Sequence, residues 1–399
     1  MTKLKHPRIL TSLAILSTLM PMLAKGYRYD EMGLGCWAEP QFLNWHMCQA
    51  FPRGDFEEVN PGKWAPLCEN IRTNLPAEIS LPLYGYHFTT NQLNTFVAAL
   101  KENHTIQYLD MQWTGLMPDD VSRVLDAAKN NDLRLLDLSD NAMTAKNLEE
   151  IGTFLTEHQG MNTLVLGHHY WQKLNPEQVP QIVSRKEIKP FTDALRKHKG
   201  LKTLVLRGWN ITTDAMKELF DALKENKSVE CLDMQETFKN DSKRVDLLVD
   251  YLASNPHLKE IMIWNSGLGP GTGAKIAKAV EKNTNLRELW TGGNNFSKND
   301  FYAIAKMLPK NKTLKVLYCD GERDEAVGTA LANAMLNNSS ITKPGFIDYQ
   351  KMKEEDIKTI TQAARFNSKH EGQDITLKQW RETHTPDPRN IQDWERWVR

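Results

Sequence analysis

The chain has 399 residues, of which 40% are hydrophobic and 25% charged, so it is long enough for two ordinary domains or one elongated array and has the composition of a folded soluble protein. Basic and acidic side chains number 50 each. Since this balance lacks the strong basic excess of most nucleic-acid-binding proteins, we expect no nucleic acid among the partners.

Residues 1–26 have the pattern of a secretory signal. A basic start, MTKLKHPR, precedes the apolar run ILTSLAILSTLMPML (residues 9–23), which is shorter than the about 20 residues that a membrane-spanning helix needs. Ala24 and Gly26 supply small side chains at the −3 and −1 positions of a cleavage site. We predict export, cleavage after residue 26, and a secreted or periplasmic protein with no stable membrane span. The alternative is an uncleaved anchor.

Residues 27–78 carry three of the five cysteines and are predicted to cap the N-terminal end of the regular part of the chain. Two of Cys36, Cys48 and Cys68 are expected to form a disulfide, as suits an exported protein. The alternative is a thiol catalyst built from His46 and Cys48. No C-x-x-C pair occurs in the sequence, so no metal site is predicted.

From residue 79 to about residue 365 the chain repeats one pattern. LKTLVL and VECLDM are two examples, in which apolar residues stand at a lead position and three and five residues after it. Successive leads are 27–29 residues apart, apart from one gap of 40 residues. The leads are Ile106, Leu133, Met161, Leu201, Val229, Leu258, Leu286 and Leu314, with a degenerate ninth at Ile341.

A second marker stands three residues before each lead, after an amphipathic run such as MKELFDALKEN. The marker residues are Asn103, Asn130, His158, His198, Asn226, Asn255, Asn283, Asn311 and Asn338. Because Asn and His adopt the left-handed conformation more readily than most residues, we expect them to end each helix in that conformation. Each repeat is thus predicted to be a short strand, a turn, a helix and a helix stop.

This pattern resembles the leucine-rich repeats of the long, ribonuclease-inhibitor-like type, L-x-x-L-x-L-x-x-N-x-L followed by a helix. The resemblance implies an α/β solenoid, a curved horseshoe with a parallel sheet on the concave face and helices on the convex face. Eight residues after the lead, the Asn of the family pattern occurs only at Asn141 and Asn294. The ladder of polar side chains between repeats is therefore expected to be uneven.

Gly269, Gly271 and Ala274 have the spacing of the G-x-G-x-x-G/A fingerprint of dinucleotide-binding domains. They stand where the other repeats turn from strand to helix, and the strand that follows, NLRELWTGG, starts the next repeat. We therefore interpret the glycines as turn residues and predict neither a nucleotide nor any other cofactor.

The gap of 40 residues between Met161 and Leu201 contains an insertion at about residues 171–190. The insertion is polar and contains proline, so it is either a neutral loop or a binding loop on the rim. His168 and His169 are adjacent and point to opposite faces of an extended chain, so they are not expected to share a metal.

Residues 366–399 depart from the repeat and contain Trp380, Trp394 and Trp397. A solenoid needs a cover over its last apolar face, so we expect this segment to cap the array. The alternative is a short docking tail.

Residues two, four and six positions after each lead are expected to face the concave side, because strand side chains alternate. The fourth-position residues are Asp110, Asp137, Val165, Val205, Asp233, Met262, Trp290 and Tyr318. The predicted partner-binding patch consists of Met262, Trp264, Trp290 and Tyr318, and Trp113 and His168 are predicted rim contacts. One alternative is that the C-terminal cap folds back over the patch. Asp110 and Asp137 are neighbours in this row and are close enough to make an acidic patch for a cation or a basic partner, but a solvated strand face is the favoured interpretation.

An extended concave surface suits the binding of a macromolecule better than the turnover of a small substrate. We therefore predict an exported protein-binding scaffold and no catalytic residues. Because the signal looks bacterial, and leucine-rich repeat proteins of host-associated bacteria often engage host proteins, analogy suggests a host protein as the partner. The alternatives are a structural or adhesive cell-surface protein and, less favoured, an enzyme that uses the N-terminal Cys/His segment.

Overall fold

Each sequence repeat folds into one short strand followed by one helix in the computed structural model, which describes residues 61–74, 80–83, 85–167, 182–346, 348 and 350–383. Several predicted features lie outside these residues: the signal, Cys36, His46, Cys48, His168, Trp394 and Trp397. Predictions about them stay predictions.

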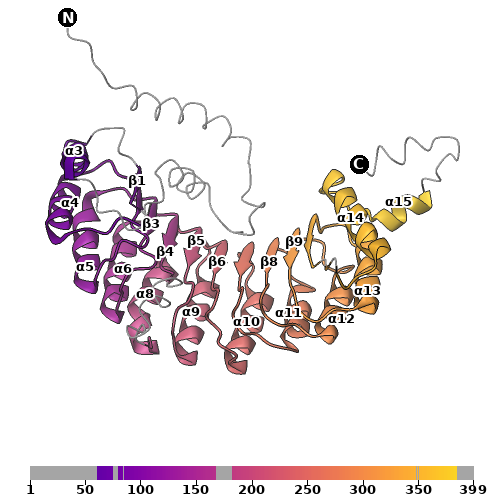
Figure 1. The fold of residues 1–399 in the computed structure, drawn as a ribbon. Helices are drawn as coiled ribbons and strands as arrows, with labels where there is room; N and C mark the ends of the chain where they lie inside the picture. Colours follow the sequence, from indigo (N-terminus) through magenta and orange to yellow (C-terminus); the bar gives the residue numbers. More distant parts are fainter. Residues whose placement is uncertain are drawn as a thin grey trace, which may run out of the picture.

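Within the described residues, ten strands of three residues each form one parallel sheet, in which they lie in chain order. They are β1 (Ser80–Pro82), β2 (Tyr108–Asp110), β3 (Leu135–Asp137), β4 (Thr163–Val165), β5 (Thr203–Val205), β6 (Cys231–Asp233), β7 (Glu260–Met262), β8 (Glu288–Trp290), β9 (Val316–Tyr318) and β10 (Lys343–Gly345). Figure 1 shows an arc with the strands along its inner edge and the helices along its outer edge. The α/β solenoid predicted from the repeats is confirmed.

The helices begin and end close to the places that the repeats predict. They are α3 (Pro61–Arg72), α4 (Thr90–Glu102), α5 (Pro118–Ala127), α6 (Ala145–Glu157), α8 (Arg185–Lys197), α9 (Thr213–Glu225), α10 (Ser242–Ser254), α11 (Thr272–Val280), α12 (Lys298–Met307), α13 (Glu325–Leu336), α14 (Glu354–Lys369) and α15 (Leu377–Thr383). Residues 185–190, predicted to belong to the insertion, instead form the start of α8, because Ser184 and Glu187 make a capping box there. No helix among the described residues is both long and apolar enough to cross a membrane.

The main core lies between the sheet and the helices. The residues three and five positions after each lead, such as Leu204 and Leu206, are buried in it, whereas the intervening residue belongs to the opposite face. The same core continues to both ends of the described array. Trp64 of α3 packs against Phe88 and Phe96 at the N-terminal end, with ring centroids 5.3 and 5.9 Å away. At the C-terminal end α14 packs on α13.

The marker residues end the helices in a different way from the one predicted. Asn226 has an extended backbone (φ −70°, ψ 129°), as do Asn103, His198 and Asn255, so the expectation of a left-handed conformation was wrong. The Asn226 side chain instead joins two repeats. Its Nδ2 donates to the carbonyl of Leu195 (2.6 Å), and its Oδ1 accepts from the N–H of Val229 (2.8 Å). An extended backbone is what directs this amide back toward the preceding repeat.

The ladder of polar side chains eight residues after the lead is uneven, as predicted. Asn141 Nδ2 donates to the carbonyl of Met111 (2.7 Å), and Asn294 Nδ2 donates to that of Ile263 (2.7 Å). At the same position of another repeat, the shorter Ser266 reaches the preceding repeat with its Oγ at 3.3 Å. Trp209 also makes this bridge, because its indole N–H donates to the carbonyl of Leu166, so the ladder is built from side chains of different size and reach.

The glycines of the apparent nucleotide fingerprint shape the turn into α11. Gly269 and Gly271 have φ angles of 73° and 86°, which glycine adopts at low cost, and Gly271 is the N-cap of the helix. The carboxylate of Asp300, from the next repeat, accepts from the N–H groups of Gly271 (2.9 Å) and Ala274 (2.8 Å). The N–H groups that a pyrophosphate would use are thus bonded within the protein.

Candidate protein-binding site on the concave face

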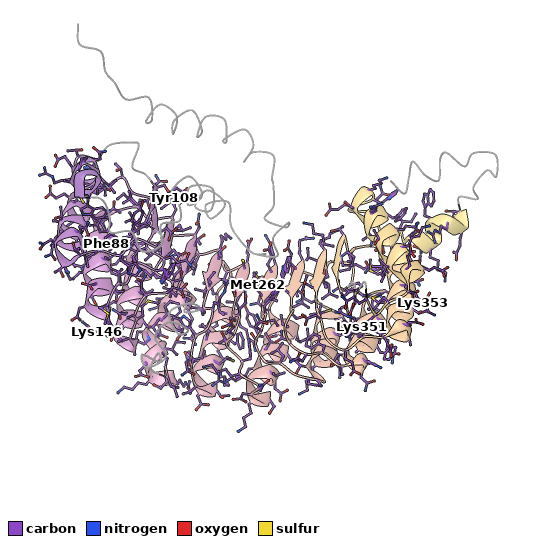
Figure 2. All side chains as sticks on the ribbon, viewed as in Figure 1. Phe88, Tyr108, Lys146, Met262, Lys351 and Lys353 are labelled. Carbon is purple, nitrogen blue, oxygen red and sulfur yellow. The ribbon has the colours of Figure 1, made fainter. Side chains whose placement is uncertain are left out.

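The concave face carries the row of fourth-position residues that the repeats predict. The strands pair without a register shift, so Asp233, Met262, Trp290 and Tyr318 follow one another directly on β6, β7, β8 and β9. Figure 2 places Met262 among the strands and Lys146 among the helices, on the two faces of the arc. The row begins acidic at β2 and β3 and ends apolar and aromatic at β7 to β9.

The apolar end of this row forms a cluster that is separate from the main core. We call it the concave apolar cluster, and it consists of Cys231, Met262, Trp264, Trp290, Val316 and Tyr318. Met262 and Trp290 are buried, with 1% and 4% of their surface exposed, whereas Trp264 and Tyr318 are half-buried. The structure therefore brings the four predicted patch residues together. Two of them, Met262 and Trp290, are buried, although they were expected to face water.

The aromatic rings of the cluster stack across three strands. The ring centroids of Trp264 and Tyr318 are 4.8 Å apart with an interplanar angle of 24°, and those of Trp290 and Tyr318 are 5.8 Å apart at 16°. Stacked pairs of this kind contribute about 0.5–1.5 kcal/mol each beyond the burial of their area. The stacking pre-orders large side chains that a flexible surface would have to immobilise on binding.

Two glycines make room for this stacking. A Cβ atom on Gly292 would lie 3.0 Å from the Tyr318 ring and 3.5 Å from the Trp264 ring, and a Cβ atom on Gly345 would lie 2.3 Å from the Tyr318 ring. The Tyr318 ring thus leans over both neighbouring strands. Larger residues at these two positions would push the rings apart.

The two indole N–H groups of the cluster differ in their partners. Trp290 Nε1 donates to the carboxylate of Glu288 at 3.2 Å. Trp264 Nε1 is buried and has no hydrogen-bond partner. Since a buried donor without an acceptor costs about 1–3 kcal/mol, the cluster would gain from an acceptor brought by a bound chain.

The acidic end of the row is also buried. Burial raises the pKa of Asp110 to about 6, although its bond from the Gln112 N–H opposes the change. Burial, followed by the charge of Asp110, raises the pKa of Asp137 well above its ordinary value. The third aspartate of the row, Asp233, accepts a hydrogen bond from the guanidinium of Arg207 at 2.8 Å. Asp110 and Asp137 are adjacent but buried, so the expectation of a solvated strand face was wrong for this pair.

The remaining predicted residues are not part of the cluster. Trp113, which follows β2, packs edge-on against His87, with ring centroids 6.2 Å apart, four strands away from β6. His168 lies outside the described residues. The described part of the predicted C-terminal cap packs elsewhere, since Trp380 contacts Phe366 of α14 at 5.9 Å between ring centroids. No residue of α14 or α15 belongs to the described concave apolar cluster.

Sequence reasoning missed two members of the cluster, Cys231 and Val316. Each is the first residue of its strand, two positions after the lead, and the alternation rule places that position on the concave side. Applying the rule to that row would have found both. The stacking of Trp264 on Tyr318 had no such signal, because it depends on Gly292, which follows β8 between them.

Two of the three described cysteines lie in the main core, whereas Cys231 belongs to the concave apolar cluster. Cys68 and Cys319 are free thiols buried in the main core, and burial raises their pKa to about 11 and about 12. A thiol this hard to deprotonate is a poor nucleophile, so Cys68 offers little to a thiol catalyst. It is also not one of the bridged cysteines, which leaves Cys36 and Cys48 of the predicted candidates, and both lie outside the described residues. Cys319 is the buried thiol that its strand position predicts.

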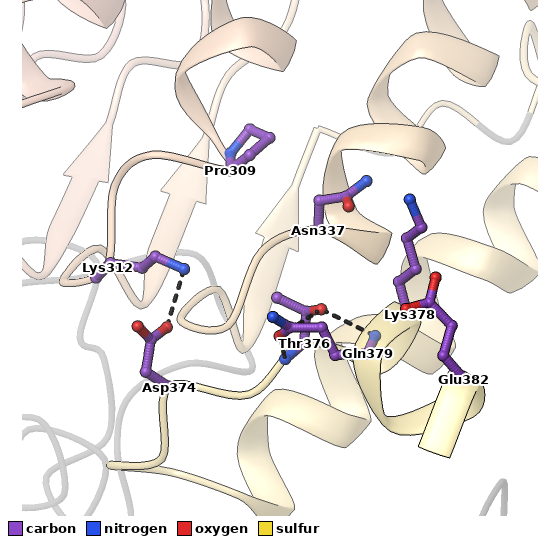
Figure 3. A pocket seen from close by; sticks show the side chains of 8 residues that line it. All are labelled: Pro309, Lys312, Asn337, Asp374, Thr376, Lys378, Gln379 and Glu382. Carbon is purple, nitrogen blue, oxygen red and sulfur yellow. Dashed lines mark hydrogen bonds and ion pairs between the residues drawn. The ribbon is translucent and has the colours of Figure 1, made fainter. Parts of the chain in front are cut away.

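Neither a metal centre nor a small-molecule site emerges from the described residues. They contain no group of three or more His, Cys, Asp or Glu side chains that could hold a metal ion. A pocket of about 350 Å³ lies at the C-terminal end (Figure 3), lined by Pro309, Lys312, Asn337, Asp374, Thr376, Lys378, Gln379 and Glu382. Lys312 Nζ lies 2.9 Å from Asp374 Oδ1, so the pocket is the junction between residues 374–382 and the last repeats.

Comparisons with known proteins find likeness at the level of fold. No protein-family model matches the chain, and no curated protein matches it. Among solved structures, the leucine-rich repeat-containing protein LegL7 from Legionella pneumophila is 18% identical, with a TM-score of 0.46 over 76% of this chain and 96% of that one.

Two shorter structures also match. The actin-binding site 2 of leiomodin-1 is 15% identical, with a TM-score of 0.33 over 48% of this chain and 95% of that one. The C-terminal domain of a Caenorhabditis elegans tropomodulin is 14% identical, with a TM-score of 0.29 over 45% of this chain and 92% of that one. The identification of the fold rests on this chain itself: a repeated strand, turn and helix, stacked in register into one parallel sheet, make it a leucine-rich repeat solenoid.

Proposed function

We propose that this chain is a protein-binding scaffold that holds a macromolecular partner on its concave face. One observation carries the proposal: two tryptophans, a tyrosine and a methionine from three consecutive strands gather on the concave side, apart from the main core. The main core already stabilises the array, so folding alone does not require this second cluster. Tryptophan and tyrosine are the residues most enriched among the energetic anchors of protein interfaces.

The partner, in this proposal, presents an apolar segment with a hydrogen-bond acceptor. The segment lies across β7 to β9, where Trp264 and Tyr318 are half-buried and keep part of their surface exposed. Its acceptor meets the indole N–H of Trp264, which is buried without a partner. Anchors of this type typically cost about 2 kcal/mol or more of binding energy when they are truncated.

Export and a host partner belong to this proposal as well. The basic start, the apolar run and the small residues before position 27 support export to a secreted or periplasmic location. The analogy with leucine-rich repeat proteins of host-associated bacteria supports a host protein as the partner. Attachment at the cell surface is the second candidate function, and labelling of intact cells with a membrane-impermeant reagent separates it from full release.

Site-specific photo-crosslinking tests the proposed binding face. A photo-crosslinking amino acid replaces Gln235, which follows β6 beside the cluster, and a matched control replaces Lys146 on the convex helix α6. Both proteins are incubated with host and self lysates, with and without a thiol reductant because the cluster contains Cys231. We expect one protein to be captured from the concave position and not from the convex one. Capture from Lys146 alone would contradict a concave site.

The affinity for the captured protein then tests the anchors. Trp264→Ala and Tyr318→Ala are preferred to changes at Trp290, because truncating a fully buried ring would also weaken the fold. We expect each to lower the affinity about 30-fold or more, which corresponds to about 2 kcal/mol. The control is Gln112→Ala, six residues after the lead like Trp264 but on another strand, and it should bind like the wild type. Unchanged affinity in the folded double variant would refute the assignment.

A further inference from the structure

Cys231 has a different place in the fold from the other two described cysteines. It is the first residue of β6, paired in register with Thr203 and Glu260, and it belongs to the concave apolar cluster. Its exposed fraction is 8%. Cys68 and Cys319 are free thiols on the opposite side of the sheet, inside the main core. Cys231 is therefore the described cysteine that a segment lying on the concave face could reach.

The chain itself contains a segment with matching chemistry. Residues 27–60 include YRYDEMGLGCWAEPQFLNWHMCQAF, in which tyrosine, tryptophan, phenylalanine, leucine and methionine alternate with polar residues around Cys36 and Cys48. Large apolar side chains of this kind are stabilised by burial against another apolar surface. The concave apolar cluster offers such a surface, together with the unpartnered N–H of Trp264 for a backbone carbonyl.

The segment is long enough to reach the cluster. It precedes Pro61, the first residue of α3, which packs on α4 at the N-terminal end of the array. β6 lies five strand spacings from β1, or about 24 Å at about 4.8 Å per spacing. The dozen or so residues between Cys48 and Pro61 span up to about 40 Å when extended, and those between Cys36 and Pro61 span about twice that. For both cysteines, the chain before Pro61 is therefore longer than the about 24 Å between β1 and β6.

In place of the bond between Cys36 and Cys48 that the sequence alone suggests, we propose that residues 27–60 of this same chain lie on the concave apolar cluster and are held there by a disulfide between Cys231 and either Cys36 or Cys48. Two thiols form one S–S bond and release two protons and two electrons. The electrons pass by thiol–disulfide exchange to a disulfide-bearing oxidant of the oxidising compartment, which is reduced to its dithiol. The N-terminal segment thereby occupies the surface that the proposed function assigns to a partner, and reduction releases it.

Peptide mapping of the wild-type mature protein tests the bond directly. The oxidised protein is alkylated without reduction and digested with trypsin, which leaves Cys231 on the peptide 228–239 and both N-terminal cysteines on the peptide 29–53. We expect these two peptides to be joined, and a second cleavage with cyanogen bromide after Met47, between Cys36 and Cys48, to show which cysteine is used. A bond between Cys36 and Cys48, an alkylated Cys231, or a dimer linked through Cys231 on a non-reducing gel would each overturn the proposal.

Limited proteolysis tests whether the segment is held on the cluster. Cleavage after Arg28 and Arg53 should become at least 10-fold faster in Cys231→Ser than in the oxidised wild type. Reductant should accelerate cleavage of the wild type to the same rate and leave the variant unchanged, which serves as the matched control. Equal cleavage rates in the oxidised wild type and the variant would show that the segment is not held through Cys231.

The effect on partner binding rests on the proposed function, and its failure can be told apart from failure of the disulfide. If the cluster binds the captured partner, reduced wild type and Cys231→Ser should bind it at least 10-fold more tightly than oxidised wild type. A mapped disulfide without this difference would contradict the proposed use of the cluster by a partner. Absence of the disulfide would contradict this inference and leave concave binding standing.

Discussion

Replacing Asn226 by alanine should destabilise the array by about 3 kcal/mol. Asn226 is buried, and its amide serves buried backbone groups of two repeats. Its Oδ1 accepts from the N–H of Ser228 and of Val229, each at 2.8 Å, and its Nδ2 donates to the carbonyl of Leu195 at 2.6 Å. Alanine leaves these three backbone groups without that partner, and each buried group left unpaired lowers the free energy of unfolding by about 1 kcal/mol or more.

The assay is urea unfolding followed by far-UV circular dichroism, with Asn337→Ala as a control. Asn337 is another asparagine at the end of a helix, but its side chain only returns to the carbonyl of Asn333 in its own helix, so its loss should cost less than about 0.5 kcal/mol. Asn226→His should recover much of the stability. His198 fills the equivalent position, with Nδ1 accepting from the N–H of Leu201 at 2.9 Å and Nε2 bonding the carbonyl of His158 at 3.1 Å.

Two outcomes would refute this reasoning about the helix stops. A loss below about 1 kcal/mol for Asn226→Ala would mean that the bridged groups find other partners. A His variant as unstable as the alanine variant would mean that the observed His198 contacts do not substitute for an amide.

Three further predictions follow from the concave face and the N-terminus. Asp110 and Asp137 bind protons more readily in the folded than in the unfolded protein, so the melting temperature should rise as the pH falls from about 7 toward the ordinary Asp pKa of 3.8. In the double variant Asp110→Asn, Asp137→Asn the melting temperature should depend less on pH over this range. Gly292→Val should separate the Trp264 and Tyr318 rings and reduce the near-UV circular dichroism of the cluster, and an unchanged spectrum would count against the stacking. N-terminal sequencing of the protein from its native cell should begin within a few residues of position 27, whereas an intact Met1 would contradict cleavage.

The row of concave residues was predictable because it depends on two local regularities. The repeat sets which residue leads each strand, and strand geometry then sends alternate side chains to opposite faces. Leu204 and Leu206 therefore lie in the core and Val205 on the concave side, as their spacing predicts. The same two rules predict that Met262, Trp290 and Tyr318 are neighbours on adjacent strands, and the register of the strands confirms it.

Contacts between repeats could not be predicted, because they depend on how side chains of different strands fill shared space. Only the packed structure shows that Asn226, with an extended backbone, donates to a carbonyl of the preceding repeat, and that the Asp300 carboxylate accepts from the N–H of Gly271. The stacking of Trp264 on Tyr318 likewise requires the missing side chain of Gly292 between them. A one-dimensional pattern specifies the face on which each residue lies, whereas ring tilt, close approach and burial are decided when neighbouring repeats pack together.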